Sequence, residues 1–213
     1  QILILLISTT GISQEKFSRE ISFITDNDLF ISSYQDRYYS SGFFLAYKYL
    51  SKRKSNSLEK RIFKWELGHK MFTPYKSTIN NVIDHDRPFA GYFYGSFGID
   101  RVYKKNQLLN TSLQIGVIGP NSFAREIQQF IHDVYDFRKA IGWKYQIKNA
   151  LALNFSFNYL KTILKTKKNH VDVTWVNHLN FGSIFTNTAS GVYTRIGIKP
   201  LQKLTNTIAF NTN

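Results

Sequence analysis

Strict alternation of apolar and polar residues is the feature that most limits the folds open to this chain. It is clearest in LALNFSFNYL, residues 151–160, where Leu151 and Leu153 alternate with Ala152 and Asn154. Because successive side chains of a strand point to opposite faces, this segment has one apolar face and one small polar face. In water the apolar face packs on another layer, whereas in an outer membrane it meets lipid and the polar face lines the lumen.

Period-two segments recur along almost the whole chain, separated by polar turns. Further strands are expected around Ile21, Phe44, Lys64, Phe97, Leu113, Val173 and Thr194. The pattern therefore predicts an all-β protein, either an antiparallel transmembrane β-barrel or a soluble β-sandwich. About eight strands can be counted up to Lys199, and the segment LTNTIAFN holds the start of another.

The composition agrees with a membrane protein that has an anionic partner. Aromatic residues make up 16% of the chain, with 18 Phe and 13 Tyr, which suits aromatic girdles at two membrane interfaces. Lys and Arg number 28 against 14 Asp and Glu, and the net charge of +14 favours nucleic acid, anionic lipid or a phosphorylated glycolipid. The absence of cysteine excludes disulfides, thiol catalysis and cysteine-ligated zinc.

The chain divides into a leader and one β-domain. Residues 1–13 hold a short apolar run followed by small residues, as before a signal-peptidase cut. We therefore expect a partial signal peptide over 1–13 and an outer-membrane β-barrel domain over 14–213. The basic segments LSKRKSNSLEKR (50–61) and KTKKNH (165–170) are expected to be solvated loops or to contact lipid phosphates.

One segment breaks the all-β pattern. After the strand-like IGVI, Gly119-Pro120 marks a turn, and Asn121 and Ser122 are plausible capping residues of a helix. The expected helix has an apolar stripe of Phe123, Ile127, Phe130, Ile131 and Val134, and another face with Arg125, Gln128, His132 and Tyr135. On spacing alone, His132 is more often a surface or packing histidine than a catalytic one.

Four other clusters carry polar side chains suited to chemistry. They are TDNDLF (25–30), QDRYYSSG (35–42), FTP (72–74) and DHDRPFAGYFY (84–94). Asp26, Asn27 and Asp28 offer the hard oxygen ligands that Ca²⁺ prefers, although such runs are more often self-capping turns.

Two of these clusters have a structural interpretation. Ser40 and Ser41 lack a G-x-S-x-G elbow, so a serine-hydrolase nucleophile is poorly supported. Asp86 and Arg87 are expected to form a buried ion pair at the rim of the barrel.

Taken together and in this order, the clusters resemble the outer-membrane lipid A 3′-O-deacylase family. The matching segments are NDLF, DRYYSSGFFLAY, FTP, DRPFAG, and IGVIGP followed by EIQQFIH, which together span residues 22–143. The resemblance implies a barrel of about twelve strands with its active site at the outer-leaflet side, between the wall and a short helix. Because this chain supplies about eight strands, we expect a C-terminally truncated, incomplete barrel whose sheet stays open.

The resemblance also implies roles for individual residues. It marks Asn27 and Asp28 as active-site groups near a calcium ion, Ser40 as the hydroxyl residue, Gln128 as a site residue and His132 as the essential base. The implied reaction is hydrolysis of the 3′-linked acyl or acyloxyacyl ester of lipid A in the bacterial outer membrane. Water activated by His132 attacks the ester carbonyl, which Ca²⁺ polarises. Lipid A, or lipopolysaccharide, is the expected partner of a monomer that binds no nucleic acid.

Two other functions stay open at this point. A non-catalytic outer-membrane barrel, either a channel or a structural protein, could share the scaffold, because a fold does not fix a function. The presence of His132 and Gln128 together with Asn27 and Asp28 argues against it. A soluble basic β-protein that binds nucleic acid would also account for the charge of +14, and detergent extraction would separate it from a barrel.

Overall fold

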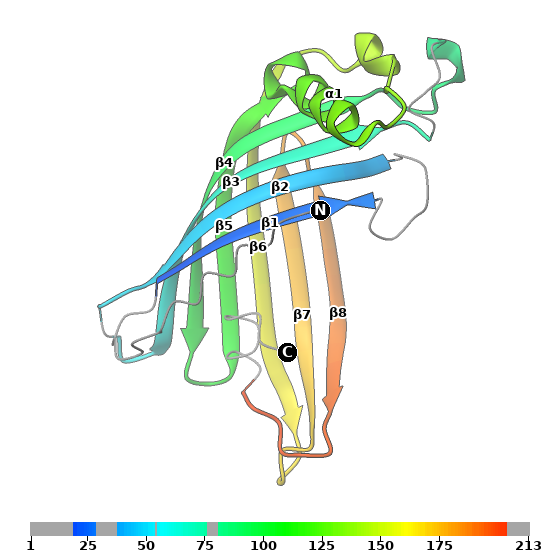
Figure 1. The fold of residues 1–213 in the computed structure, drawn as a ribbon. Coiled ribbons are helices and arrows are strands. Elements are labelled where there is room, and N and C mark those ends of the chain that lie inside the picture. Colours follow the sequence, from blue (N-terminus) through cyan, green and yellow to red (C-terminus); the bar gives the residue numbers. More distant parts are fainter. Residues whose placement is uncertain (1–18, 29–37, 54, 76–80, 204–213) are drawn as a thin grey trace, which may run out of the picture.

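Eight strands form one antiparallel sheet in which each strand pairs with its neighbours in sequence (Figure 1). The computed structural model describes residues 19–28, 38–53, 55–75 and 81–203, so the predicted signal peptide and the segment LTNTIAFN lie outside it. The strands are β1 (Arg19–Asn27), β2 (Tyr38–Leu50), β3 (Leu58–Thr73), β4 (Ala90–Tyr103), β5 (Gln107–Ile118), β6 (Ala150–Lys165), β7 (Val171–Gly182) and β8 (Asn187–Ile196). Each expected strand centre falls inside one of them, which confirms the all-β prediction.

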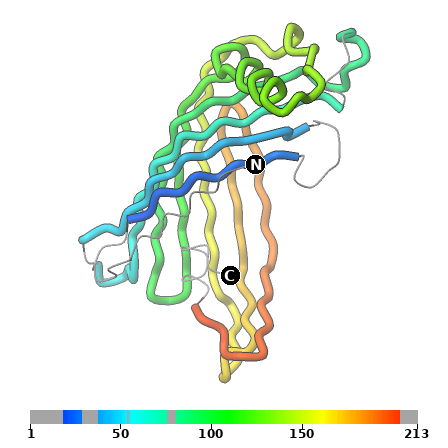
Figure 2. The backbone as a smooth tube through the Cα atoms, in the orientation of Figure 1, coloured from blue at the N-terminus to red at the C-terminus, as the bar shows by residue number. Residues whose placement is uncertain are grey.

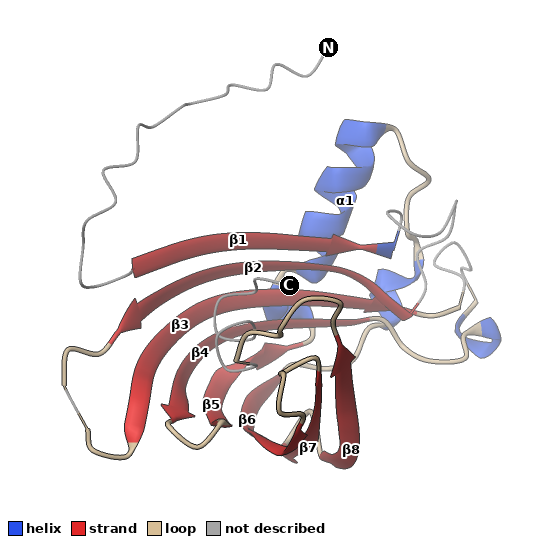
Figure 3. Cartoon of the chain, turned by 90° about the horizontal axis from the view of Figure 1, so that it is seen from below, coloured by secondary structure: helices blue, strands red, loops and turns tan. Residues whose placement is uncertain are grey.

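The sheet is curled but not closed. Viewed from below, it bends into an open C with β1 and β8 at its two edges, and the backbone trace shows the same curl (Figures 2 and 3). Among the described strands, β1 pairs only with β2 and β8 only with β7. The expectation of an open sheet is therefore confirmed.

The two faces of the sheet differ as the alternation requires. On β6, Leu151 and Leu153 are 82% and 56% exposed on the convex face, whereas Ala152 and Asn154 are each 1% exposed on the concave face. Asn154 donates to the Tyr92 hydroxyl at 3.2 Å from this concave side. An apolar outer surface around a polar inner one is the arrangement of a membrane barrel wall, not of a soluble sandwich.

The concave face is filled near one end by the turn between β7 and β8. The backbone N–H groups of Ile184 and Phe185 donate to Oδ1 of Asn154, each at 3.1 Å. The Phe185 ring reaches Lys70 on β3, whose Nζ lies 5.4 Å from the ring centroid. This turn therefore links β6 to β3 across the inside of the curl.

The helical elements are α1 (Ala124–Tyr135) and the short 3-10 turns η2 (Val82–Asp84), η3 (Pro120–Ser122) and η4 (Gly142–Tyr145). The predicted helix is confirmed, but its predicted capping by Asn121 and Ser122 is wrong. The N-cap is Phe123, at a φ of 57° and with no side-chain cap. Ser122 Oγ instead donates to the Gly119 carbonyl at 2.6 Å, because η3 takes up these residues before α1 begins. Within the described part of the chain, no helix is long and apolar enough to span a membrane.

Antiparallel pairing separates the connections into two groups. Among the described residues, the helix end of the sheet carries 74–75, 81–89, 119–149 and 183–186, and the hairpin end carries 51–53, 55–57, 104–106 and 166–170. At the helix end, α1 contacts β4 and β3 (Figure 1). The predicted basic loops both lie at the hairpin end, which is the end opposite α1.

Gly91 on β4 is where the helix meets the wall. A Cβ atom at this position would lie 2.0 Å from Ser122 Oγ and 2.3 Å from the Ala124 Cβ atom, so only glycine allows the approach. His69 on β3 holds the same turn from the side, since its Nε2 lies 2.8 Å from the Ser122 carbonyl oxygen. The hydrophobic cluster beneath α1 consists of Met71, Phe89, Ala124, Ala140 and Trp143, with Phe43 and Ile127 packed against it.

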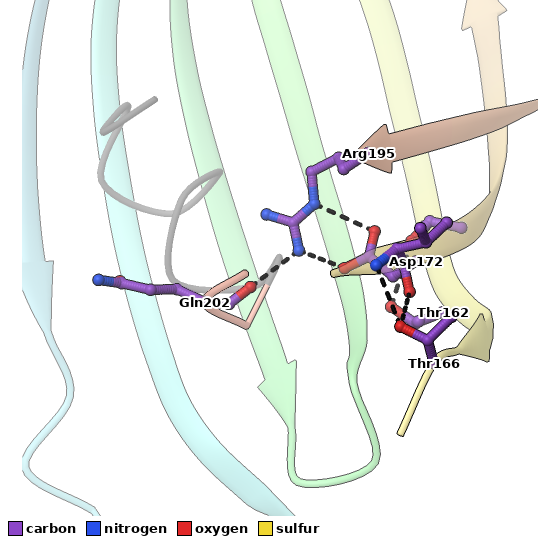
Figure 4. A network of polar contacts seen from close by, with 7 residues as sticks. Thr162, Thr166, Asp172, Arg195 and Gln202 are labelled. Atoms are coloured by element: carbon purple, nitrogen blue, oxygen red, sulfur yellow. Dashed lines mark hydrogen bonds and ion pairs between the residues drawn. The ribbon is translucent and has the colours of Figure 1, made fainter. Parts of the chain in front are cut away.

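A buried ion pair ties β7 to β8 at the hairpin end (Figure 4). Arg195 donates through Nε and Nη2 to the two carboxylate oxygens of Asp172, and the same Nη2 donates to the Gln202 carbonyl at 2.8 Å. The side chains of Arg195 and Asp172 are 12% and 3% exposed. A bidentate pair with so little solvent contact depends on both partners, because either charge alone would be left buried.

We expect Asp172→Ala to lower the free energy of unfolding by about 3 kcal/mol, because Arg195 would keep a buried charge without its carboxylate. Urea unfolding in detergent micelles, followed by tryptophan fluorescence, measures the change. The control is Asp133→Ala, which breaks an exposed pair whose Lys139 and Asp133 side chains are 66% and 57% exposed. Its cost should stay below about 1 kcal/mol, and equal costs for the two variants would contradict the argument.

We expect Gly91→Ala to push the start of α1 off the wall at a cost of about 1–3 kcal/mol, because the added methyl group overlaps Ser122 and Ala124. Gly95→Ala is the matched control on the same strand and face, where the nearest atom is Leu67 Cδ2 at 3.9 Å. Hydrogen exchange of the α1 amides should rise in Gly91→Ala and stay unchanged in Gly95→Ala. Unchanged exchange in both variants would show that the close contact does not position the helix.

Candidate functional site

A row of paired residues runs across the outward, convex face at the helix end. Asn27 on β1 pairs with Ser41 on β2, Ser41 with Met71 on β3, and Met71 with Gly91 on β4. Directly paired residues of an antiparallel sheet point to the same face. Since Gly91 touches the Ser122–Ala124 turn, the whole row lies on the side of the wall that α1 covers.

The axis of α1 runs along this row of paired residues, so the polar residues of the helix lie over successive strands. Figures 1 and 3 show the helix running across the strands from the β4 side toward the β1 side. A helix rises about 1.5 Å per residue, so His132 lies about 12 Å beyond Ala124. Three strand spacings of about 4.8 Å separate β4 from β1. Gln128 and His132 are therefore carried toward the ends of β2 and β1, in agreement with the packing of Ile127 in the cluster that includes Phe43 of β2.

The helix buries two polar side chains and leaves part of its apolar stripe exposed. Gln128 and His132 are 4% and 6% exposed, whereas Phe123, Phe130 and Val134 are 62%, 69% and 61% exposed. In a soluble protein such a helix would bury the apolar stripe instead. An exposed apolar stripe fits a helix that faces lipid and shields a polar site against the wall.

The two buried polar side chains of α1 each have a partner in the loop that follows the helix. Trp143 Nε1 donates to Gln128 Oε1 at 2.6 Å. His132 Nδ1 lies 2.6 Å from the Arg138 carbonyl oxygen. Because a carbonyl oxygen only accepts, Nδ1 carries the proton in this contact and Nε2 keeps its lone pair. The loop thus selects the tautomer in which Nε2 of neutral His132 can accept a proton.

Ser40 occupies an irregularity in β2. The register with β3 shifts between Tyr39 and Ser41, so that Ser40 is an extra residue opposite Met71. Its hydroxyl is buried and donates to the Met71 carbonyl at 3.3 Å. The bulge places two consecutive serines in the buried region at the helix end, and the bond to Met71 gives Ser40 a structural role in it.

Asn27 and Asp28 lie where β1 ends, with Asn27 on the outward face opposite Ser41. Asp26, by contrast, accepts a hydrogen bond from the Tyr39 hydroxyl at 3.0 Å and pairs with Gly42, on the concave face. Alternation therefore separates Asp26 from Asn27.

The oxygen atoms near this strand end suit a hard cation. Asn27, Asp28 and Ser41 offer amide, carboxylate and hydroxyl oxygens, and a hard cation such as Ca²⁺ binds oxygen ligands only. Thr73, at the end of β3, adds a buried hydroxyl that has no hydrogen-bond partner among the described residues. In the same part of the chain, no group of three or more His, Asp or Glu side chains is close enough to hold a metal ion. A cation here would thus depend on amide, hydroxyl and backbone oxygens beside Asp28.

The rim residues form a different contact from the predicted one. Arg87 Nε lies 3.1 Å from Asp86 Oδ2, but the two side chains are 52% and 37% exposed, so the predicted burial of the pair is wrong. The backbone N–H of Tyr75 donates to Asp86 at 2.8 Å, and this bond and Arg87 hold the pKa of Asp86 below its usual value. Arg87 also lies 4.1 Å from the Tyr38 ring centroid. These contacts fasten the connection between β3 and β4 beside the bulge of β2.

The predicted residues fall into two groups at the helix end of the sheet, and pairing places Asn27 on the convex side that α1 covers. Gln128 and His132 share the buried face of α1, and Asn27, Asp28 and Ser40 lie at the ends of β1 and β2. The basic loops at 50–61 and 165–170 are not part of this site, because antiparallel pairing places them at the hairpin end.

Three residues of the site were not found from the sequence. Trp143, the Arg138 carbonyl and His69 position Gln128, His132 and the start of α1. Trp143 and Arg138 lie in an irregular loop without periodicity, and a backbone carbonyl has no residue signature. His69 lies in a regular strand, where alternation gives its face but not its partner.

Comparison with known proteins agrees with this fold. No curated protein sequence matches the chain. Among solved structures, LpxR from Salmonella typhimurium is similar, with a TM-score of 0.61 and 19% sequence identity over 75% of this chain and 53% of that chain. At this identity the similarity shows the shared β-barrel fold, and the chain spans about half the length of the solved protein.

The family comparison covers nearly the whole sequence. The family model described as outer membrane protein LpxR matches residues 2–210. It includes the strand ends, the bulge and the helix described above, and it overturns the alternative of a soluble nucleic-acid-binding protein. The chain belongs to the outer membrane protein LpxR family.

Proposed function

We propose that this chain carries the active site of a lipid A 3′-O-deacylase, a carboxylic-ester hydrolase of the outer membrane. The substrate is the 3′-linked acyl or acyloxyacyl ester of lipid A. The observation that carries the proposal is the buried His132, whose Nδ1 is bonded to the Arg138 carbonyl so that Nε2 can act as a base. Membership of the LpxR family, and a fold shared with the Salmonella protein of that name, support it.

His132 acts as the general base. Its Nε2 takes a proton from a water molecule while the water oxygen bonds to the ester carbonyl carbon. The bond from that carbon to the sugar oxygen then breaks, and the sugar oxygen takes the proton from His132 as it leaves. General base catalysis of this kind supplies about 10²–10⁴-fold in rate. Direct attack by water needs no acyl-enzyme, which agrees with the bond between the Ser40 hydroxyl and the Met71 carbonyl.

Gln128 is placed to act as a donor. Because Trp143 Nε1 donates to its Oε1, the amide group is held with its acceptor toward the loop. The NH₂ group is then the end of Gln128 that can donate to the oxygen of the tetrahedral intermediate. A fixed donor in a site shielded from water stabilises developing negative charge without reorganisation.

Asn27 and Asp28 are the residues that would hold calcium, with Ser40 beside them in the bulge. Their oxygen donors fit a hard cation, and Asn27 lies on the same face as α1. When bound, the ion would polarise the ester carbonyl and stabilise its negative charge.

The exposed apolar surface of α1 suits acyl chains. Phe123, Phe130 and Val134 lie on the lipid-facing side of the helix, and Phe93 and Ile115 continue an apolar surface over the wall. An acyl chain can contact this surface while its ester reaches the buried polar face. All of the groups come from one chain, so a monomer is sufficient for the reaction.

We expect His132→Asn to reduce deacylation at least about 100-fold while leaving the fold intact, because it removes a proton acceptor and little apolar packing. Mass spectrometry of lipid A from cells expressing the full-length protein measures loss of the 3′ acyl chain. His170→Asn is the matched control, since His170 Nδ1 also bonds a backbone carbonyl, that of Gly197 at 2.9 Å, but at the hairpin end. Normal deacylation by folded His132→Asn would exclude His132 as the base.

We also expect a calcium chelator to stop turnover, and Asp28→Asn to weaken calcium binding far more than Asp26→Asn. The two carboxylates are two residues apart, but Asp26 bonds Tyr39 on the concave face. Calorimetric titration of the purified protein with calcium gives the affinity directly, and lipid A hydrolysis gives the activity. Full activity in excess chelator, or equal effects of the two substitutions, would remove calcium from the proposal.

A further inference from the structure

The hairpin end of the sheet has an unbalanced positive charge. Its three turns have the sequences SKRKSNS, KKN and TKKNH, which contain no acidic residue. Exposed cations described there include Arg53, Lys104, Lys105, Lys167 and Lys168. The connections at the helix end mix both signs instead, with Asp84, Asp86, Asp133 and Asp136 among Arg87, Arg138 and Lys139. Only the hairpin end therefore has the charge to attract an anionic partner.

Two arginines lie side by side on the convex face just inside these turns. Arg61 on β3 pairs directly with Arg101 on β4. Both lie on the outward face, because the inward positions next to them are Ile62 and Asp100, whose carboxylate bonds Asn110 within the concave surface. Like charges directly opposite each other destabilise a sheet unless an anion lies between them.

The described residues supply no such anion. No carboxylate among them lies within ion-pairing distance of Arg61 or Arg101. Arg101 Nη1 donates to the Thr111 hydroxyl at 3.0 Å, a neutral partner. Arg61 Nε is buried and has no hydrogen-bond partner in the described part of the chain. The two guanidinium groups thus keep donors for an external acceptor, and the planar fork of arginine matches a phosphate.

Aromatic rings cover the convex face next to these arginines, on the side away from the turns. Tyr49 stacks on Phe63 with centroids 5.2 Å apart, Phe63 lies 6.1 Å from Phe97, and Trp65 lies 4.6 Å from Phe97. Along β3 the outward side chain therefore changes from Trp65 and Phe63 to Arg61 as the strand nears its turn. Aromatic girdles mark the interface of a membrane barrel, and cations beyond them lie at the level of the headgroups.

We propose that Arg61 and Arg101 bind the headgroup phosphate of an anionic phospholipid in the membrane leaflet opposite α1. The lysines of the hairpin turns add attraction at longer range, and the acyl chains of the lipid lie along Phe63 and Trp65. The occupant is a phospholipid because the arginines lie on the outward wall of an outer-membrane protein, directly beside its aromatic surface. This inference does not depend on the proposed deacylase activity, whose site is at the other end of the sheet.

The tryptophans of the chain provide a direct test. Trp65 and Trp175 are 53% and 43% exposed on the wall, whereas Trp143 is 1% exposed. With Trp175 replaced by phenylalanine, Trp65 is the exposed tryptophan that remains among the described residues. We would reconstitute full-length Trp175→Phe protein in phosphatidylethanolamine vesicles that contain phosphatidylglycerol, with bromine on the acyl chains of one lipid or the other. Stronger quenching by the brominated phosphatidylglycerol measures the preference for the anionic lipid. Each arginine should contribute about five-fold to this preference at low ionic strength.

Two variants make the result specific. Arg61→Gln with Arg101→Gln should abolish most of the preference, whereas Lys139→Gln with Lys148→Gln, which removes the same charge near α1, should leave it unchanged. Heat-modifiable gel migration reports folding of each variant. Equal quenching by the two brominated lipids in the Trp175→Phe protein with both arginines intact would overturn the proposal. Loss of the preference on adding excess inorganic phosphate alone would show a site for free anions and would also overturn it.

Discussion

The approach of the Ser122–Ala124 turn to Gly91 determines where every later residue of α1 lies, because a helix is a stiff rod with a fixed rise per residue. The missing side chain on β4 sets the depth of the helix, and the bond between His69 and the Ser122 carbonyl holds the turn in place. From that fixed start, regular geometry carries Gln128 and His132 across β3 toward the ends of β2 and β1. The position of the site residues on α1 thus depends on the contact with Gly91 and on the direction of the helix axis.

The exposed part of the apolar stripe of α1 fits contact with lipid on the outer side of the helix. A membrane-facing surface can leave Phe130 and Val134 exposed, because burial inside the protein gains little over contact with lipid. The polar side chains then turn toward the wall, where the loop after the helix supplies their hydrogen-bond partners. Contact with lipid likewise accounts for the exposed leucines of β6. Apolar side chains thus face outward from both the helix and the strand, with a period of about 3.6 residues in the helix and two in the strand.

Much of this architecture could be predicted from the sequence, because alternation is a local property. The strand centres, the open sheet and the helix through His132 are all correct. Two predictions about side-chain contacts were wrong. Ser122 bonds within η3 instead of capping the helix, and Asp86 stays exposed because Tyr75 and Arg87 hold it at the rim. Counting strand directions from the helix would have placed the basic loops at the hairpin end. Trp143 had no signal, because its role depends on the path of an irregular loop.

The position of α1 on the outside of the wall has a consequence for kinetics. Because α1 lies on the convex face, a membrane lipid reaches the buried face of this helix by moving sideways within the plane of the membrane. Encounter rates are then set by surface density, the mole fraction of the lipid in its leaflet, and by lateral diffusion. Dilution of the whole sample would leave the rate per protein unchanged, whereas dilution of the same lipid within the bilayer would lower it in proportion.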